Sequence, residues 1–117
     1  MKRNTKYLEE LLDRKFPEHG ALEVISGPED GRLCPLSAAP ATVGRLETAD
    51  IVLGLDSSVS RRHARITCEG GCYFIEDMGS THGTAVNGRN IATKTELKDG
   101  DEIVIGSSLL RVRRKDA

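Results

Sequence analysis

Residues 64–76, ARITCEGGCYFIE, consist of two short segments rich in strand-forming residues, separated by a pair of glycines. β-Branched and aromatic residues favour strands, and adjacent glycines are typical of turns. Residues 64–68 and 72–76 are therefore predicted to form two strands joined by a hairpin whose tip is Glu69-Gly70-Gly71. This hairpin indicates a β-rich fold.

The same alternation of short strands and turn residues continues on both sides of the hairpin. Further strands are predicted at 22–25, 32–36, 41–43, 51–53, 84–86, 90–91, 102–105 and 109–112. In the last of these, Leu110 and Val112 are expected to face the core, whereas Arg111 and Arg113 face water. Many short strands with no helical stretch among them predict an all-β, antiparallel β-sandwich.

The first twenty residues differ from the rest of the chain. Four apolar residues recur at helical spacing among charged ones: Tyr7, Leu8, Leu11 and Leu12. Pro17 and Gly20 are expected to end a short amphipathic helix. Such a helix can pack on the sandwich, pair with a second copy or lie loose. The predicted organisation is an N-terminal helical extension (1–20), a β domain (21–114) and a tail (115–117).

Composition limits the classes of partner. The 17 Lys and Arg nearly balance the 18 Asp and Glu, so no broad field for nucleic acid or membrane is expected. No apolar run approaches the roughly 18–20 residues that span a bilayer, and charged residues follow the N-terminal Met1. We therefore expect a cytoplasmic chain. Cys68 and Cys72 flank the hairpin tip, so a disulfide is conceivable, but two reduced thiols are expected.

Three polar loops follow predicted strands and share a chemistry that suits an anion. Gly44-Arg45 places a guanidinium directly after a strand, beside a glycine that lets the backbone turn sharply. Residues 57–63 (SSVSRRH) and 79–88 (GSTHGTAVNG) are rich in hydroxyls and contain no carboxylate. Each loop alone is also typical of a solvated surface turn. Together they predict a local phosphate site.

These segments together resemble the signature of the forkhead-associated (FHA) domain family. The matching segments are Gly44-Arg45, SRRH at 60–63, DMGSTHGT at 77–84, VNG at 86–88 and the closing strand pair LKDGDEIVIG at 97–106. The resemblance covers about residues 22–114. It implies an eleven-strand antiparallel β-sandwich of the FHA type whose loops at one end bind phosphothreonine peptides.

The resemblance also implies roles for individual residues. The phosphate ligands would be Arg45, Ser60, Arg61 and Thr81, and Thr81 would favour phosphothreonine over phosphoserine. The loop-structuring residues would be Gly44, His63, Asp77, Gly83 and Asn87, with Gly79 and Ser80 in similar roles. Arg62 alternates to the other direction from Arg61 and is expected to be solvated. Residues 46–49 and 88–90 would set peptide selectivity.

His82 would contact the peptide backbone, and it departs from the commoner asparagine of the family. A histidine can make one such hydrogen bond, whereas an amide offers both a donor and an acceptor. If His82 lies beside the phosphate, its protonated form is favoured and binding should strengthen mildly below pH 7.

An enzyme is not expected. Ser60 and His63 are three residues apart in a loop, and a nucleophile and base would also need an orienting carboxylate and an oxyanion site. Paired carboxylates, metal-ligand spacing and cofactor loops are missing from the sequence, so no metal and no cofactor are expected.

The sequence therefore predicts a non-catalytic phosphothreonine-peptide binding module that mediates signalling interactions with a Ser/Thr kinase or a kinase substrate. The alternative is an FHA-fold scaffold that binds a partner independently of phosphorylation, through the N-terminal helix or a sandwich face. A further variant is intramolecular: Thr5, flanked by the basic Lys2, Arg3 and Lys6, would occupy the chain's own site once phosphorylated.

Overall fold

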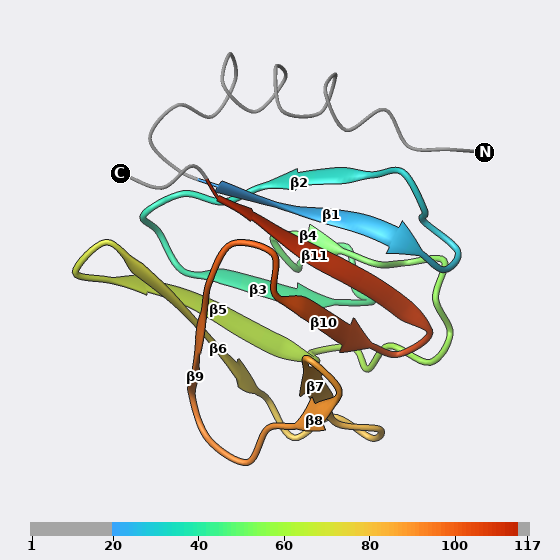
Figure 1. Ribbon diagram of the computed structural model, residues 1–117. Helices are drawn as coiled ribbons and strands as arrows, with labels where there is room; N and C mark the ends of the chain where they lie inside the picture. Colours follow the sequence, from blue (N-terminus) through green and yellow to red (C-terminus); the bar gives the residue numbers. More distant parts are fainter. Residues whose placement is uncertain (1–19, 115–117) are drawn as a thin grey trace.

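The computed structural model describes residues 20–114, which form two packed β-sheets (Figure 1). The strands are β1 (Gly20–Ser26), β2 (Leu33–Pro35), β3 (Ala41–Gly44), β4 (Ile51–Val52), β5 (Ala64–Glu69), β6 (Cys72–Asp77), β7 (Thr84–Val86), β8 (Arg89–Asn90), β9 (Thr95–Leu97), β10 (Glu102–Ile105) and β11 (Ser108–Arg114). One sheet has the order β2-β1-β11-β10-β7-β8 and the other has the order β4-β3-β5-β6-β9. This confirms the all-β sandwich. The predicted N-terminal helix and the tail lie outside the described residues.

The hairpin at 64–76 forms as the sequence predicts. β5 and β6 pair antiparallel with Ile66 opposite Ile75, and Gly70 and Gly71 both have positive φ angles, 60° and 79°. Two consecutive left-handed residues are the geometry of a tight hairpin turn whose twist matches that of the strands, and glycine adopts it without steric cost.

The same register settles the question of a disulfide. Cys68 lies opposite Tyr73, whereas Cys72 lies opposite Glu69. Residues that face each other across a ladder share a side of the sheet, and successive residues alternate sides. Cys68 and Cys72 therefore point to opposite faces of the hairpin, and both are free. The conceivable disulfide does not form.

The core lies between the inner faces of the two sheets. Alternate residues of the long strands supply it, and these are the fully buried side chains: Leu22, Val24, Val43, Ile66, Ile75, Ile103, Ile105, Leu110 and Val112. The inward positions predicted for β11 are thus confirmed.

The outward arginines of β11 are less exposed than the sequence suggested. Arg111 donates to Glu102 at 2.7 Å, and Arg113 Nε lies 3.9 Å from Glu23 Oε1. The Arg113 side chain is only 16% exposed. These two outward-facing arginines are therefore paired with glutamates of neighbouring strands and are not simply hydrated.

The sandwich is not wholly antiparallel, which corrects the prediction. β3 and β4 pair in parallel, with Val43 opposite Ile51 and Gly44 opposite Val52. The connecting loop doubles back beside β3, where Thr42 N and Oγ1 donate to the Asp50 carboxylate and Asp50 N donates to Thr42 Oγ1. Because these bonds return the chain to the start of β3, β4 then runs in the same direction.

β9 was not predicted as a strand of its own. It pairs with β6, Leu97 opposite Tyr73 and Thr95 opposite Ile75, and Leu97 is fully buried. One apolar residue among Lys94, Glu96 and Lys98 gives no strand pattern in the sequence, so only the pairing partner reveals it.

The two ends of the described chain are neighbours, because Gly20 pairs with Arg114. The other end of β11 begins at Ser108, which contacts the loop between β4 and β5 through Asp56. The loops that follow β3, β4 and β6 therefore lie at the opposite end of the sandwich from both chain ends (Figure 1). No helix among residues 20–114 is long and apolar enough to cross a bilayer.

Candidate functional site

Three loops meet at one end of the sandwich: residues 45–50 between β3 and β4, residues 53–63 between β4 and β5, and residues 78–83 between β6 and β7. Arg45 N donates to Ser60 O at 3.1 Å. Thr81 N donates to Ser60 Oγ at 2.9 Å, and the two hydroxyl oxygens are 3.5 Å apart. Ser60 thus connects all three loops, and the structure brings Arg45, Ser60 and Thr81 together.

The Arg45 side chain is exposed, but a hydrogen bond fixes its position. Its Nε donates to Val59 O at 3.1 Å, which lays the guanidinium along the loop that carries Ser60. A guanidinium has five N–H donors, and this is the one hydrogen bond that its side chain makes within residues 20–114. Its other four N–H donors are therefore available to a ligand.

Gly44 has a different role from the one that the sequence suggested. Its φ is not positive, so no sharp turn requires a glycine there. Instead, a Cβ at Gly44 would lie 2.0 Å from Arg61 O and 2.9 Å from Arg61 C. The backbone that carries Ser60 and Arg61 packs directly against the end of β3. Any side chain at residue 44 would push this loop away.

His63 is fully buried and ties two loops together. Its Nδ1 accepts from Ser60 N at 3.0 Å, so Nε2 carries the proton and donates to Gly83 O at 2.8 Å. Both ring nitrogens are thereby bonded to the backbone, and the Ser60 hydroxyl bonds Thr81 instead of this imidazole. His63 is placed to orient the two loops and not to remove a proton from Ser60.

Asp77 anchors the third loop with one carboxylate. It accepts from Gly79 N and Ser80 N at 3.0 Å, from Ser80 Oγ at 2.6 Å and from Thr84 Oγ1 at 2.7 Å. Partial burial raises the pKa of Asp77, but the hydrogen bonds from Ser80, Thr84 and Gly79 outweigh it and hold the pKa below its ordinary value. The charged carboxylate therefore stabilises this loop.

Asp77→Asn is expected to lower the free energy of unfolding at pH 7 by about 1–3 kcal/mol, because an amide replaces two of the acceptor lone-pair sites by donors. A folded-state pKa below the unfolded one stabilises the protein above the unfolded value of about 3.9, and this stabilisation is lost as the pH falls through the folded value. Urea unfolding between pH 7 and pH 3 should therefore show the gap between wild type and variant narrowing in acid. A constant gap contradicts this account, and Glu47→Gln, on an exposed loop, is the control.

The remaining predicted residues divide into two groups. Arg61 and His82 are exposed at the loop end, and Gly83 has a φ of 82° that suits glycine. Asn87, by contrast, is not part of the loop cluster. Its φ is 50°, and its side chain bonds Glu102 N at 2.9 Å and Asp101 Oδ1 at 3.0 Å. It fixes the β7–β8 turn to β10.

Asp56 is a residue of this end that the sequence analysis missed. It is 1% exposed and accepts from Ser58 N, Ser107 N and Ser108 Oγ at 2.7–3.0 Å. It therefore fastens the Ser60 loop to the turn between β10 and β11. An aspartate just before two serines is a common turn signal, and it could have indicated this anchor.

The comparisons with known proteins point to one family. A model described as "FHA domain" matches residues 41–106. FhaB of Mycobacterium tuberculosis, an FHA domain-containing protein, is 32% identical over 105 residues, which cover 88% of this chain and 67% of that protein. The glycogen accumulation regulator GarA of Mycolicibacterium smegmatis is 41% identical over 92 residues, 78% of this chain and 57% of that protein.

Solved structures agree. One, from a study described as "Structural and functional analysis of phosphothreonine-dependent FHA domain interactions", has a TM-score of 0.76 and 33% identity, and the match covers 85% of this chain and 99% of that one. Another is EmbR of Mycobacterium tuberculosis in complex with a low-affinity phosphopeptide, with a TM-score of 0.76 and 32% identity over 97% of this chain and 30% of that one. The chain belongs to the FHA domain family.

Proposed function

We propose that this chain is a non-catalytic module that binds phosphothreonine peptides and so mediates phosphorylation-dependent protein–protein interactions. The observation that carries the proposal is the convergence of Arg45, Ser60 and Thr81 from three separate loops. Solved relatives described as phosphothreonine-dependent or as bound to a phosphopeptide support it.

The chemistry of the site fits the ligand. A phosphate carries a charge of about −1.5 to −2 near neutral pH, and each charge-assisted hydrogen bond contributes roughly 1.5–3 kcal/mol. Arg45 and Ser60 would hold the phosphate directly, with Arg61 and Thr81 beside them. Two or three such bonds with a few backbone contacts reach about −8 kcal/mol, which corresponds to a micromolar Kd.

The other predicted residues would support this site. His82, exposed on the β6–β7 loop, would contact the peptide backbone. Gly44, His63, Asp77 and Gly83 would hold the loops in place, as their packing and hydrogen bonds suggest. The absence of a catalytic role fits the bonding of Ser60 and His63, which are not arranged as a nucleophile and its base.

The partner would be a phosphothreonine-containing protein, either a Ser/Thr kinase or one of its substrates. We place the interaction in the cytoplasm, because Cys34, Cys68 and Cys72 are all free thiols and reduced cysteines suit a reducing compartment. The intramolecular variant through Thr5 involves a residue outside the described part of the chain.

Matched peptides that differ only at one residue test the proposal. A phosphothreonine peptide selected from a library is expected to bind with micromolar Kd, and its unphosphorylated form at least a hundredfold more weakly, because two or more charged bonds are lost. The phosphoserine form should bind about fourfold more weakly, since one methyl group contributes about 0.8 kcal/mol. Isothermal titration calorimetry measures all three.

Equal binding of the phosphorylated and unphosphorylated peptides would contradict the proposal and favour a phosphorylation-independent scaffold. In that case a partner's affinity should fall on removal of residues 1–19, or on substitution of a sandwich face, and should be insensitive to Arg45. Testing the same partner against both kinds of variant separates the two functions.

A further inference from the structure

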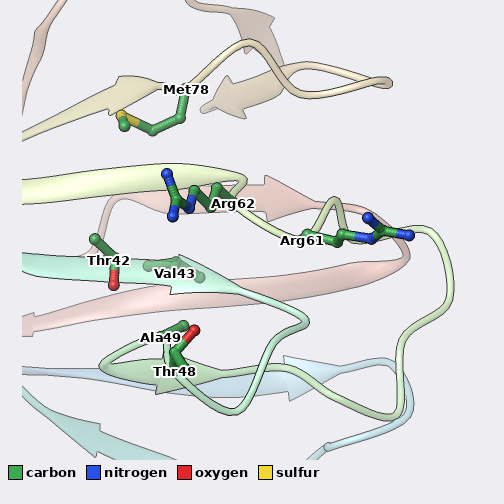
Figure 2. Close-up of a pocket in the computed structure, with 7 residues that line it drawn as sticks. All are labelled: Thr42, Val43, Thr48, Ala49, Arg61, Arg62 and Met78. Carbon is green, nitrogen blue, oxygen red and sulfur yellow. The ribbon is translucent and has the colours of Figure 1, made fainter.

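A pocket lies beside the three loops, on the outer side of the five-stranded sheet (Figure 2). Its volume is about 280 Å³. Thr42 of β3, Thr48 and Ala49 of the following loop, and Met78 after β6 line it together with Arg61 and Arg62. Thr42 faces outward because its neighbour Val43 is a fully buried core residue.

The walls of this pocket are held in place by hydrogen bonds. The reciprocal bonds between Thr42 and Asp50 fix the loop that carries Thr48 and Ala49. On the other side, Met78 N donates to His63 O at 2.9 Å, which sets Met78 next to the start of β5. The Met78 side chain nevertheless remains 43% exposed. The pocket is therefore formed before any ligand arrives and presents an apolar thioether to it.

Within residues 20–114, no acidic side chain pairs with the two arginines of this pocket, although the Asp50 carboxylate bonds its lining residue Thr42. Two of its lining residues are arginines and none is a carboxylate. Within residues 20–114, the side chains of Arg61 and Arg62 take part in no hydrogen bond or ion pair. On the other sheet and its connections, Arg32, Arg111 and Arg113 each have a glutamate partner. Arginines without an acidic partner at a concave surface favour an anionic ligand.

The side chains of Arg61 and Arg62 point to different parts of the surface. Figure 2 shows their side chains extending in opposite directions from the end of the β4–β5 loop, Arg61 toward the loop end of the sandwich and Arg62 back along β5. Their backbone is held on both sides, because Arg45 N donates to Ser60 O and His63 N donates to Val43 O. Arg61 is thus directed to the phosphate loops and Arg62 to the pocket.

We propose that this pocket binds an acidic side chain of the same phosphopeptide, with glutamate preferred. The inference rests on the proposed function and deepens it. Arg62 would pair with the carboxylate, while Met78 and Ala49 would pack against the side-chain methylenes, of which glutamate has two and aspartate one. About 280 Å³ lies below the roughly 300–1,000 Å³ of small-molecule sites and suits a single amino-acid side chain. Arg62 is exposed, as the sequence suggested, and would in addition be a specificity residue.

The test is a set of phosphothreonine peptides in which Glu, Gln or Lys is placed in turn at each position on both sides of the phosphothreonine. For wild type, Glu should bind about two- to fivefold more tightly than Gln at one position, in keeping with an exposed ion pair. In Arg62→Gln this preference should vanish, while the affinity for the all-Gln phosphothreonine peptide changes less than twofold. In Arg62→Glu the same position should come to prefer Lys. Lys98→Gln makes the same charge change at an exposed site on the β9–β10 connection and should keep the Glu preference.

Three outcomes overturn the inference. If phosphothreonine-dependent binding is intact but no position prefers Glu, or if the preference survives in Arg62→Gln, the pocket does not read an acidic residue. If Arg62→Gln weakens every phosphothreonine peptide equally, Arg62 belongs to the phosphate site instead. If wild type does not distinguish phosphorylated from unphosphorylated peptides, the proposed function itself fails and the inference fails with it.

Discussion

Arg45→Ala is expected to weaken binding of a phosphothreonine peptide by about a hundredfold. The substitution removes a guanidinium that has four free N–H donors and follows a backbone N–H bonded to Ser60 O, and the loss of two charged bonds to a phosphate amounts to about 3 kcal/mol. The fold should tolerate the change. One partly buried hydrogen bond to Val59 O is lost, so the free energy of unfolding should fall by about 1 kcal/mol. Titration calorimetry and urea unfolding on the same preparation give both quantities.

Arg45→Lys is the matched variant for this experiment. It keeps the positive charge but not the planar fork of donors, so its affinity should lie between those of the wild type and Arg45→Ala. The unphosphorylated peptide should bind all three proteins equally weakly. An Arg45→Ala protein that retains wild-type affinity for the phosphorylated peptide would remove Arg45 from the site.

Gly44→Ala is expected to lower the free energy of unfolding by about 3 kcal/mol and to weaken phosphopeptide binding as well. The new Cβ would lie 2.0 Å from Arg61 O, which is part of the backbone and cannot rotate out of the way. Overpacking of this kind typically lowers the free energy of unfolding by about 1–3 kcal/mol. We expect a value at the upper end of this range, because the clash is with the backbone. Urea unfolding followed by circular dichroism measures the loss.

Gly54→Ala is the control for this substitution. Gly54 also lacks a positive φ, and its Cβ would meet Val52 Cγ1 at 3.5 Å and Arg45 O at 3.7 Å, which are ordinary contacts. Its stability should change by less than about 0.5 kcal/mol. If the two variants are equally stable, the close approach of residues 60–62 to β3 is not the reason for a glycine at position 44.

The longer strands that the sequence predicted correctly contain two or more alternating apolar residues. Ile66 and Ile75 in the hairpin, and Leu110 and Val112 in β11, carry this period and are buried as expected. β9 was missed because its single buried residue, Leu97, has no apolar partner within the strand. The parallel pairing of β4 was missed for another reason. The parallel pairing depends on the hydrogen bond between the Asp50 carboxylate and Thr42, and a sequence pattern does not show which residues the carboxylate contacts.

Some features of the candidate site could likewise be predicted from the sequence, and others could not. The convergence of Arg45, Ser60 and Thr81 was expected because motifs far apart in the sequence resemble one family signature, and the structure places these residues together. The reason for Gly44 was wrong, since spacing along the chain does not reveal which backbone passes over it. Arg62 is exposed, as predicted, but alternation gives only the direction of its side chain. The pocket beside it could not be predicted, because loops from elsewhere in the chain form it.

The pairing of Gly20 with Arg114 has a consequence for how such a unit is used. The start of the first strand and the end of the last strand lie side by side, at the end remote from the recognition loops. The unit can therefore be inserted into a longer polypeptide as a domain. Flanking sequence of any length would then attach at a single point without straining the loops. Grafting residues 20–114 between two unrelated folded proteins should therefore transfer the ligand preference intact.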